Sequence, residues 1–280
     1  MKKKAPSAAK SPKSVALAAL SPAAAKRLSR LTVLLALIAP LVDALVIFPI
    51  RQIILANSSG TGMVYQIFFH ATELFNLAAF FLLLALAVYC AMADSTRTLG
   101  RILALHGISS VFVVILLRMG IYYLLAWLDS ELYLSFDLCN QTLGALTKNG
   151  STELLYTALS LFISQIFLFV ILLIASLIAL RTRQKALAKG ADLSPLRLYK
   201  QFDDSPLPRA LRPGLIIYAV LALGNQVVDT VMTILQAGAP DGFSSLMTLV
   251  VPYFLLAIYC LLCYLVLDYG TRYIAKECAQ

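Results

Sequence analysis

Three ionisable side chains lie inside long apolar stretches of the sequence. Asp43, Arg118 and Asp229 are each flanked on both sides by residues of the kind that form a membrane-spanning helix. A charged side chain at the centre of such a helix costs roughly 2.5–3.5 kcal/mol, so these residues usually face the interior of a bundle and carry a role. The sequence therefore predicts that the three side chains face one interior and interact there, since an unpaired buried charge is strongly destabilising.

Polar side chains on other apolar stretches extend this set. His70, Glu73 and Asn76 follow one another at intervals of three residues, which predicts that they lie on one face of a helix. The candidate substrate-binding residues are Asp43, Glu73, Arg118, Gln165, Asn225 and Asp229.

These candidates share a depth in the membrane. Asp43, Arg118 and Asp229 each lie 17 residues after a basic residue that flanks their stretch, and Gln165 lies 16 residues before one. At 1.5 Å per helical residue, all four lie roughly 24 Å from the basic flank, in the outer half of a bilayer. The spacing predicts a polar layer, with Glu73 slightly nearer the outer boundary.

Helix-breaking residues accompany the polar layer. Pro40 lies one turn before Asp43 and has no N–H to donate to the carbonyl of Ala36, and Gly120 follows Arg118 closely. Interrupted helices with buried polar groups are typical of solute and ion sites in transporters. Glycine and proline are also common in membrane helices without such a role, so both interpretations stay open.

Two functions from different classes fit this pattern. We expect a small-solute or cation transporter, or the membrane-embedded substrate-binding subunit of one, working with partner membrane subunits. Two aspartates facing one arginine leave an excess of acid, which Glu73 increases and which favours a proton or a small cationic solute. The alternative is a non-transporting scaffold or assembly protein whose buried charges only fix the packing of helices.

The sequence carries no catalytic or cofactor-binding signature. It has no glycine-rich phosphate loop at a strand-to-helix turn, and His70-Ala-Thr-Glu73 lacks the further ligand that a catalytic zinc needs. Ser109 and Ser110 are not set in a nucleophile elbow. We therefore expect no enzyme activity, no metal site and no cofactor.

The overall composition is that of a polytopic membrane protein. Of the 280 residues, 60% are apolar and 13% are charged, whereas soluble domains average about a quarter charged residues. This excludes a disordered chain and an ordinary water-soluble enzyme. The net charge of +9 comes mostly from residues that flank apolar runs, so we expect no nucleic-acid partner.

Six stretches reach the roughly 20 apolar residues that a crossing helix needs. Their apolar residues are continuous and do not alternate, which favours helices over barrel strands. The predicted fold class is all-α, a polytopic bundle of six transmembrane helices. The predicted spans are residues 31–50, 64–93, 102–128, 154–180, 214–236 and 246–267.

The basic residues predict the orientation of the bundle. Of 23 lysines and arginines, only Arg51 and Lys148 fall on one side, while all others except Arg118 fall on the opposite side. The positive-inside rule then places both termini in the cytoplasm, N-in and C-in. The chain divides into a cytoplasmic tail (1–30) and a transmembrane domain (31–280) with a cytoplasmic connection at 181–213. We expect the plasma membrane, with an organellar membrane as the alternative.

Two basic segments are expected to bind the bilayer through anionic lipids of the inner leaflet. One is the N-terminal tail, which contains no acidic residue. The other begins at Ser194 and Pro195, after which Leu196, Tyr199 and Phe202 share one helical face beside basic residues. This pattern predicts a helix lying on the membrane surface, and a solvated loop is the alternative.

Overall fold

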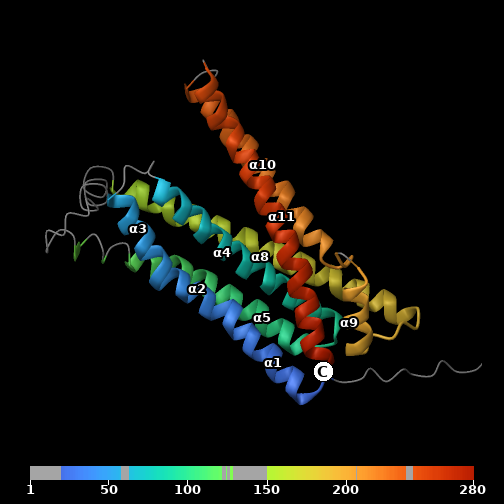
Figure 1. Cartoon of the computed structure of the whole chain (residues 1–280). Coiled ribbons are helices and arrows are strands. Elements are labelled where there is room, and N and C mark those ends of the chain that lie inside the picture. Colours follow the sequence, from blue (N-terminus) through green and yellow to red (C-terminus); the bar gives the residue numbers. More distant parts are fainter. Residues whose placement is uncertain are drawn as a thin grey trace, which may run out of the picture.

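The computed structural model describes residues 20–57, 63–121, 124, 127–128, 150–205, 207–237 and 242–280. In this part of the chain every regular element is a helix, and six helices are long and apolar enough to cross a membrane (Figure 1). The predicted all-α bundle is confirmed, and the chain is an integral membrane protein. The spans are Pro22–Arg51, Ile67–Met92, Thr96–Ile121, Phe162–Ala188, Arg212–Leu235 and Leu249–Ala279.

The first span starts earlier than its apolar stretch predicts. Ser21 caps the helix, because its Oγ accepts a hydrogen bond from the backbone N–H of Ala24 at 3.1 Å, and Pro22 occupies the first turn. The span is a continuous rod of α-helical and π-helical (η) segments. These are α1 (Pro22–Val33), η1 (Leu34–Ile38), α2 (Ala39–Val42), η2 (Asp43–Ile47) and α3 (Phe48–Asn57).

Six further helices and one π-helical segment complete the described chain. They are α4 (Met63–Met92), α5 (Thr96–Ile108) with its continuation η3 (Ser109–Leu117), α8 (Gly150–Ala188), α9 (Pro195–Asp203), α10 (Arg212–Ala237) and α11 (Phe243–Ala279).

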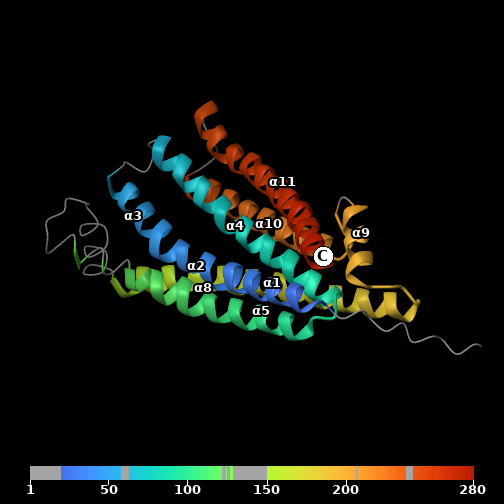
Figure 2. The ribbon, with the colours of Figure 1, turned by 60° about the horizontal axis from the view of Figure 1, so that its bottom comes forward.

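The central helix of the bundle is α4. Every residue from Leu83 to Met92 is buried, because α4 lies between the first span and the α10–α11 pair and also packs against α8 (Figure 2). Two glycines allow the close approach. A Cβ at Gly214 of α10 would lie 2.6 Å from a methyl of Leu84, and one at Gly270 of α11 would collide with Leu82. Small residues at such crossings let membrane helices approach closely.

Both ends of the described chain lie at the same end of the bundle. Arg27 of α1 forms an ion pair of 2.9 Å with Glu277 of α11, and Arg101 donates a hydrogen bond of 2.9 Å to Ser29 Oγ. The C-terminus accordingly lies beside the start of α1 (Figure 1). An even number of crossings between these two ends follows from this arrangement.

The segment after Ser194 is a helix, as predicted, and one side of it packs against the bundle. In α9, Leu198 and Phe202 are buried, and the Phe202 ring lies 6.2 Å from the ring of Tyr89 at the end of α4. Leu196, expected on the same face as Phe202, is exposed. The residues expected on one face are therefore divided, because Phe202 packs against the bundle while Leu196 is exposed. Binding of this segment to anionic lipid stays a prediction. Residues 1–19 of the basic tail lie outside the described residues.

Candidate functional site

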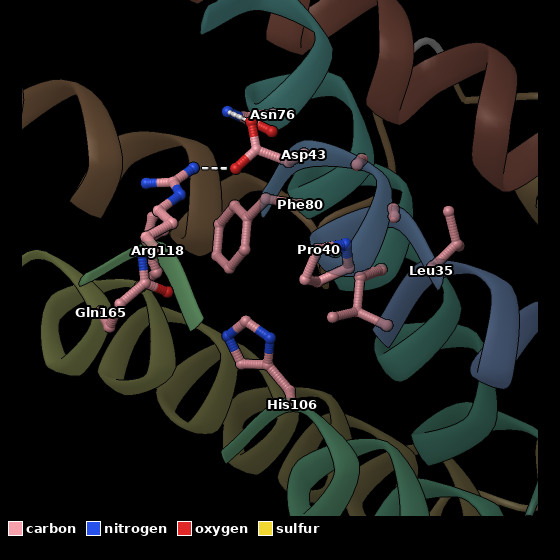
Figure 3. A pocket seen from close by; sticks show the side chains of 12 residues that line it. Leu35, Pro40, Asp43, Asn76, Phe80, His106, Arg118 and Gln165 are labelled. Carbon is pink, nitrogen blue, oxygen red and sulfur yellow. Dashed lines mark hydrogen bonds and ion pairs between the residues drawn. The ribbon is translucent and has the colours of Figure 1, made fainter. Parts of the chain in front are cut away.

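A cavity of about 160 Å³ lies among the first span, α4, the α5–η3 helix and α8 (Figure 3). Its wall is partly apolar, with Pro40, Phe80 and Leu83 among the lining residues. Its polar lining residues are Asp43, Asn76, His106, Arg118 and Gln165. Three of the sequence-predicted site residues, Asp43, Arg118 and Gln165, are thus brought together here.

Asp43 and Arg118 form an ion pair in the wall of this cavity. The Arg118 guanidinium contacts Asp43 Oδ2, and Asn76 Nδ2 donates a hydrogen bond of 2.9 Å to the other carboxylate oxygen (Figure 3). The side chains of Asp43 and Arg118 are only 5% and 16% exposed. The charge of each group is therefore compensated inside the protein, which a buried charge requires.

Both partners of the ion pair lie at the boundary of a π-helical segment. Asp43 is the first residue of η2, and Arg118 directly follows η3. In η1, just before the proline, the N–H of Ala39 donates to the carbonyl of Leu34, five residues back. Pro40, which has no N–H to donate, follows at once. Such π-helical turns occur frequently at functional sites.

His106 belongs to the cavity, although the sequence did not single it out. Its ring lies between Phe80 and Phe169, at centroid distances of 6.0 and 6.3 Å, and its buried Nε2 has no hydrogen-bond partner among the described residues. Twelve residues of regular α-helix would turn Arg118 about 120° away from His106. The π-helical turns of η3 change this rotation, so both side chains line one cavity.

Glu73 lies outside the cavity, in a second polar cluster between α4 and α11. Tyr259 Oη donates a hydrogen bond of 3.1 Å to Glu73 Oε2 and lies 2.6 Å from His70 Nδ1. The predicted common face of His70, Glu73 and Asn76 is therefore divided between two neighbours. The first two face α11, while Asn76 faces the first span.

Asp229 and Asn225 are also outside the cavity. Both side chains are exposed on α10, where Asn225 Nδ2 donates a hydrogen bond of 3.1 Å to Asp229 Oδ2. The prediction that Asp229 faces the same interior as Asp43 and Arg118 is wrong. The residue has the expected position along its helix, but α10 packs against α8 and α11 and turns Asp229 outward.

The cavity is therefore lined by one carboxylate, one guanidinium and one imidazole, and the other acidic side chains of the predicted set lie elsewhere. Within the described ranges, no three His, Cys, Asp or Glu side chains are grouped so that they could hold a metal ion. Comparison of the chain with protein-family models, with curated proteins and with solved structures finds no match.

Proposed function

We propose that the chain is a small-solute transporter, or the membrane-embedded substrate-binding subunit of one, and that the solute binds in the cavity beside Asp43 and Arg118. The observation that carries this proposal is the cavity itself. It is partly open to its surroundings, and four spans contribute to its walls. A volume of about 160 Å³ beside a buried ion pair is large enough for a small organic molecule or several waters.

The lining residues favour a small polar solute. Asn76 and Gln165 offer amide groups, and His106 adds an imidazole. A lone cation would compete with Arg118 for the Asp43 carboxylate, since the two already form an ion pair. A neutral solute, or one that carries both charges, meets no such competition. The lining therefore favours a neutral or zwitterionic solute over the cation or proton that the sequence suggests.

The proposed setting is the plasma membrane with both termini in the cytoplasm. The concentration of basic residues at the end where Arg27 meets Glu277 supports this orientation. Partner membrane subunits would complete a transport complex if the chain is the substrate-binding component.

One observation favours the alternative function, a scaffold or assembly protein. Asp43, Asn76 and Arg118 come from three different spans and are joined by direct contacts. A set of polar contacts across three helices also serves to fix helix packing. The two functions differ in whether the cavity binds a ligand.

Thermal unfolding of the purified protein with a panel of amino acids, small sugars, amines and inorganic cations tests the proposal. A solute that binds only the folded protein stabilises it and therefore raises Tm. At a concentration of one hundred times its Kd, the free energy of unfolding increases by about 2.7 kcal/mol. The shift is expected to disappear in Gln165→Leu and to persist in Gln226→Leu, a matched amide on α10 that does not line the cavity. If no solute raises Tm and Gln165→Leu unfolds like the wild type, the scaffold function is favoured.

A further inference from the structure

The outer half of α10 carries polar side chains on a surface that faces away from the bundle. Asn225, Asp229 and Thr233 follow at intervals of four residues, so they lie along one side of the helix, and all three are exposed. Only 6% of the apolar part of this span is buried within the chain. We call these three residues the α10 polar row.

The surroundings of the α10 polar row are apolar. Val227, Val228, Val231 and Met232, which occupy the other sides of the same turns, are 45–59% exposed. This part of the helix is therefore built to face hydrocarbon or another apolar helix, and it is not built as the wall of an aqueous channel. A carboxylate at this depth is costly unless a partner compensates it.

The part of the chain that the structure describes does not supply that partner. No salt bridge found in the described part of the chain involves Asp229, and its hydrogen bond to Asn225 comes from a neutral group of the same helix. A second copy would not supply a base either. Arg118 shares this depth but is already paired with Asp43, and Arg51 lies eight residues beyond Asp43, nearer the outer end of its span. If two copies packed against each other through their α10 helices, two Asp229 carboxylates would lie close together.

From this charge complementarity we propose that the α10 polar row docks a transmembrane helix of a different protein that carries a lysine or arginine in the outer half of the bilayer. The basic side chain forms an ion pair with Asp229. Asn225 and Thr233, one turn to either side, offer hydrogen-bonding groups to the partner helix. The surface lies outside the solute cavity, so this proposal does not depend on the proposed transport function.

Energy transfer in liposomes tests the docking surface. The full-length protein carries a donor fluorophore at its N-terminus and is reconstituted in phosphatidylcholine vesicles. The acceptor is on a transmembrane Leu/Ala peptide with a single lysine at the depth of Asp229. The peptide in which leucine replaces this lysine is expected to associate about 5- to 30-fold more weakly, which is the range for polar contacts between membrane helices.

Variants of the protein locate the contact. Asp229→Leu is expected to abolish the preference for the lysine peptide, and Val228→Leu on the neighbouring position is expected to keep it. In the reversed pair, the protein carries Asp229→Lys and the peptide carries aspartate in place of lysine. This pair is expected to associate again, whereas a misfolded variant would not.

Three results would each overturn the proposal. One is equal association of the lysine and leucine peptides. Another is self-association of the chain that Asp229→Leu abolishes, which would identify a second copy as the occupant. The third is labelling of Asp229→Cys by a membrane-impermeant thiol reagent, which would show a water-lined surface.

Discussion

Asp43 in the first span and Arg118 in the third, 75 residues apart in the sequence, form a buried ion pair in the wall of the cavity, and Asn76 of α4 holds the same carboxylate. Three helices therefore depend on one charged contact. Replacing Asp43 and Arg118 singly and together measures how much this contact contributes to the stability of the protein.

Arg118→Leu is expected to lower stability by about 3–5 kcal/mol, because it leaves the Asp43 carboxylate buried without a counter-charge. The double variant Asp43→Leu with Arg118→Leu should recover most of this loss, since no buried charge remains. The free energy of unfolding in detergent, or Tm, measures both. Asp229→Leu is the control and should leave Tm unchanged, since Asp229 is exposed. Equal destabilisation by Asp229→Leu would instead support the three-residue cluster that the sequence predicts.

Gly214→Val is expected to destabilise the protein by about 1–3 kcal/mol through overpacking. The added side chain would collide with Leu84, which is fully buried. Gly224→Val on the same helix is the matched control, because a Cβ at Gly224 meets nothing within 4 Å. Thermal unfolding of the two variants should differ accordingly, and equal Tm values would contradict the close approach of α10 to α4.

Phe202→Ala is expected to cost about 3–5 kcal/mol, the range for deleting a buried aromatic side chain. Phe202 joins α9 to Tyr89 near the C-terminal end of α4. Leu196→Ala, on the exposed side of α9, should change Tm little. If α9 instead lies on the lipid surface, Leu196→Ala should release it from anionic vesicles while Phe202→Ala leaves the stability of the bundle unchanged.

The orientation is checked with single cysteines in a background in which the five native cysteines are replaced by alanine. Ala191→Cys, in the connection between α8 and α9, should react with a membrane-impermeant maleimide only after permeabilisation of the cell. Ala145→Cys, in the connection expected outside, should react in intact cells. The reverse pattern of labelling would invert the assigned topology.

Much of the architecture can be predicted from the sequence because it depends on position along one dimension. The length of each apolar run determines how many spans there are, and the rise of 1.5 Å per residue converts sequence distance into depth. The placement of basic residues predicts which end faces the cytoplasm. Residues 43 and 118 accordingly share a depth, and the structure joins them.

Tertiary structure decides which way each side chain turns and which helix it meets. Asp229 has the depth of Asp43 but faces outward, and Glu73 meets Tyr259 of α11, away from the cavity. His106 enters the cavity because η3 has π-helical turns, which change the rotation between His106 and Arg118. The physical reason is that depth accumulates steadily with every residue, whereas facing direction depends on local helix geometry and on the neighbour against which each helix packs.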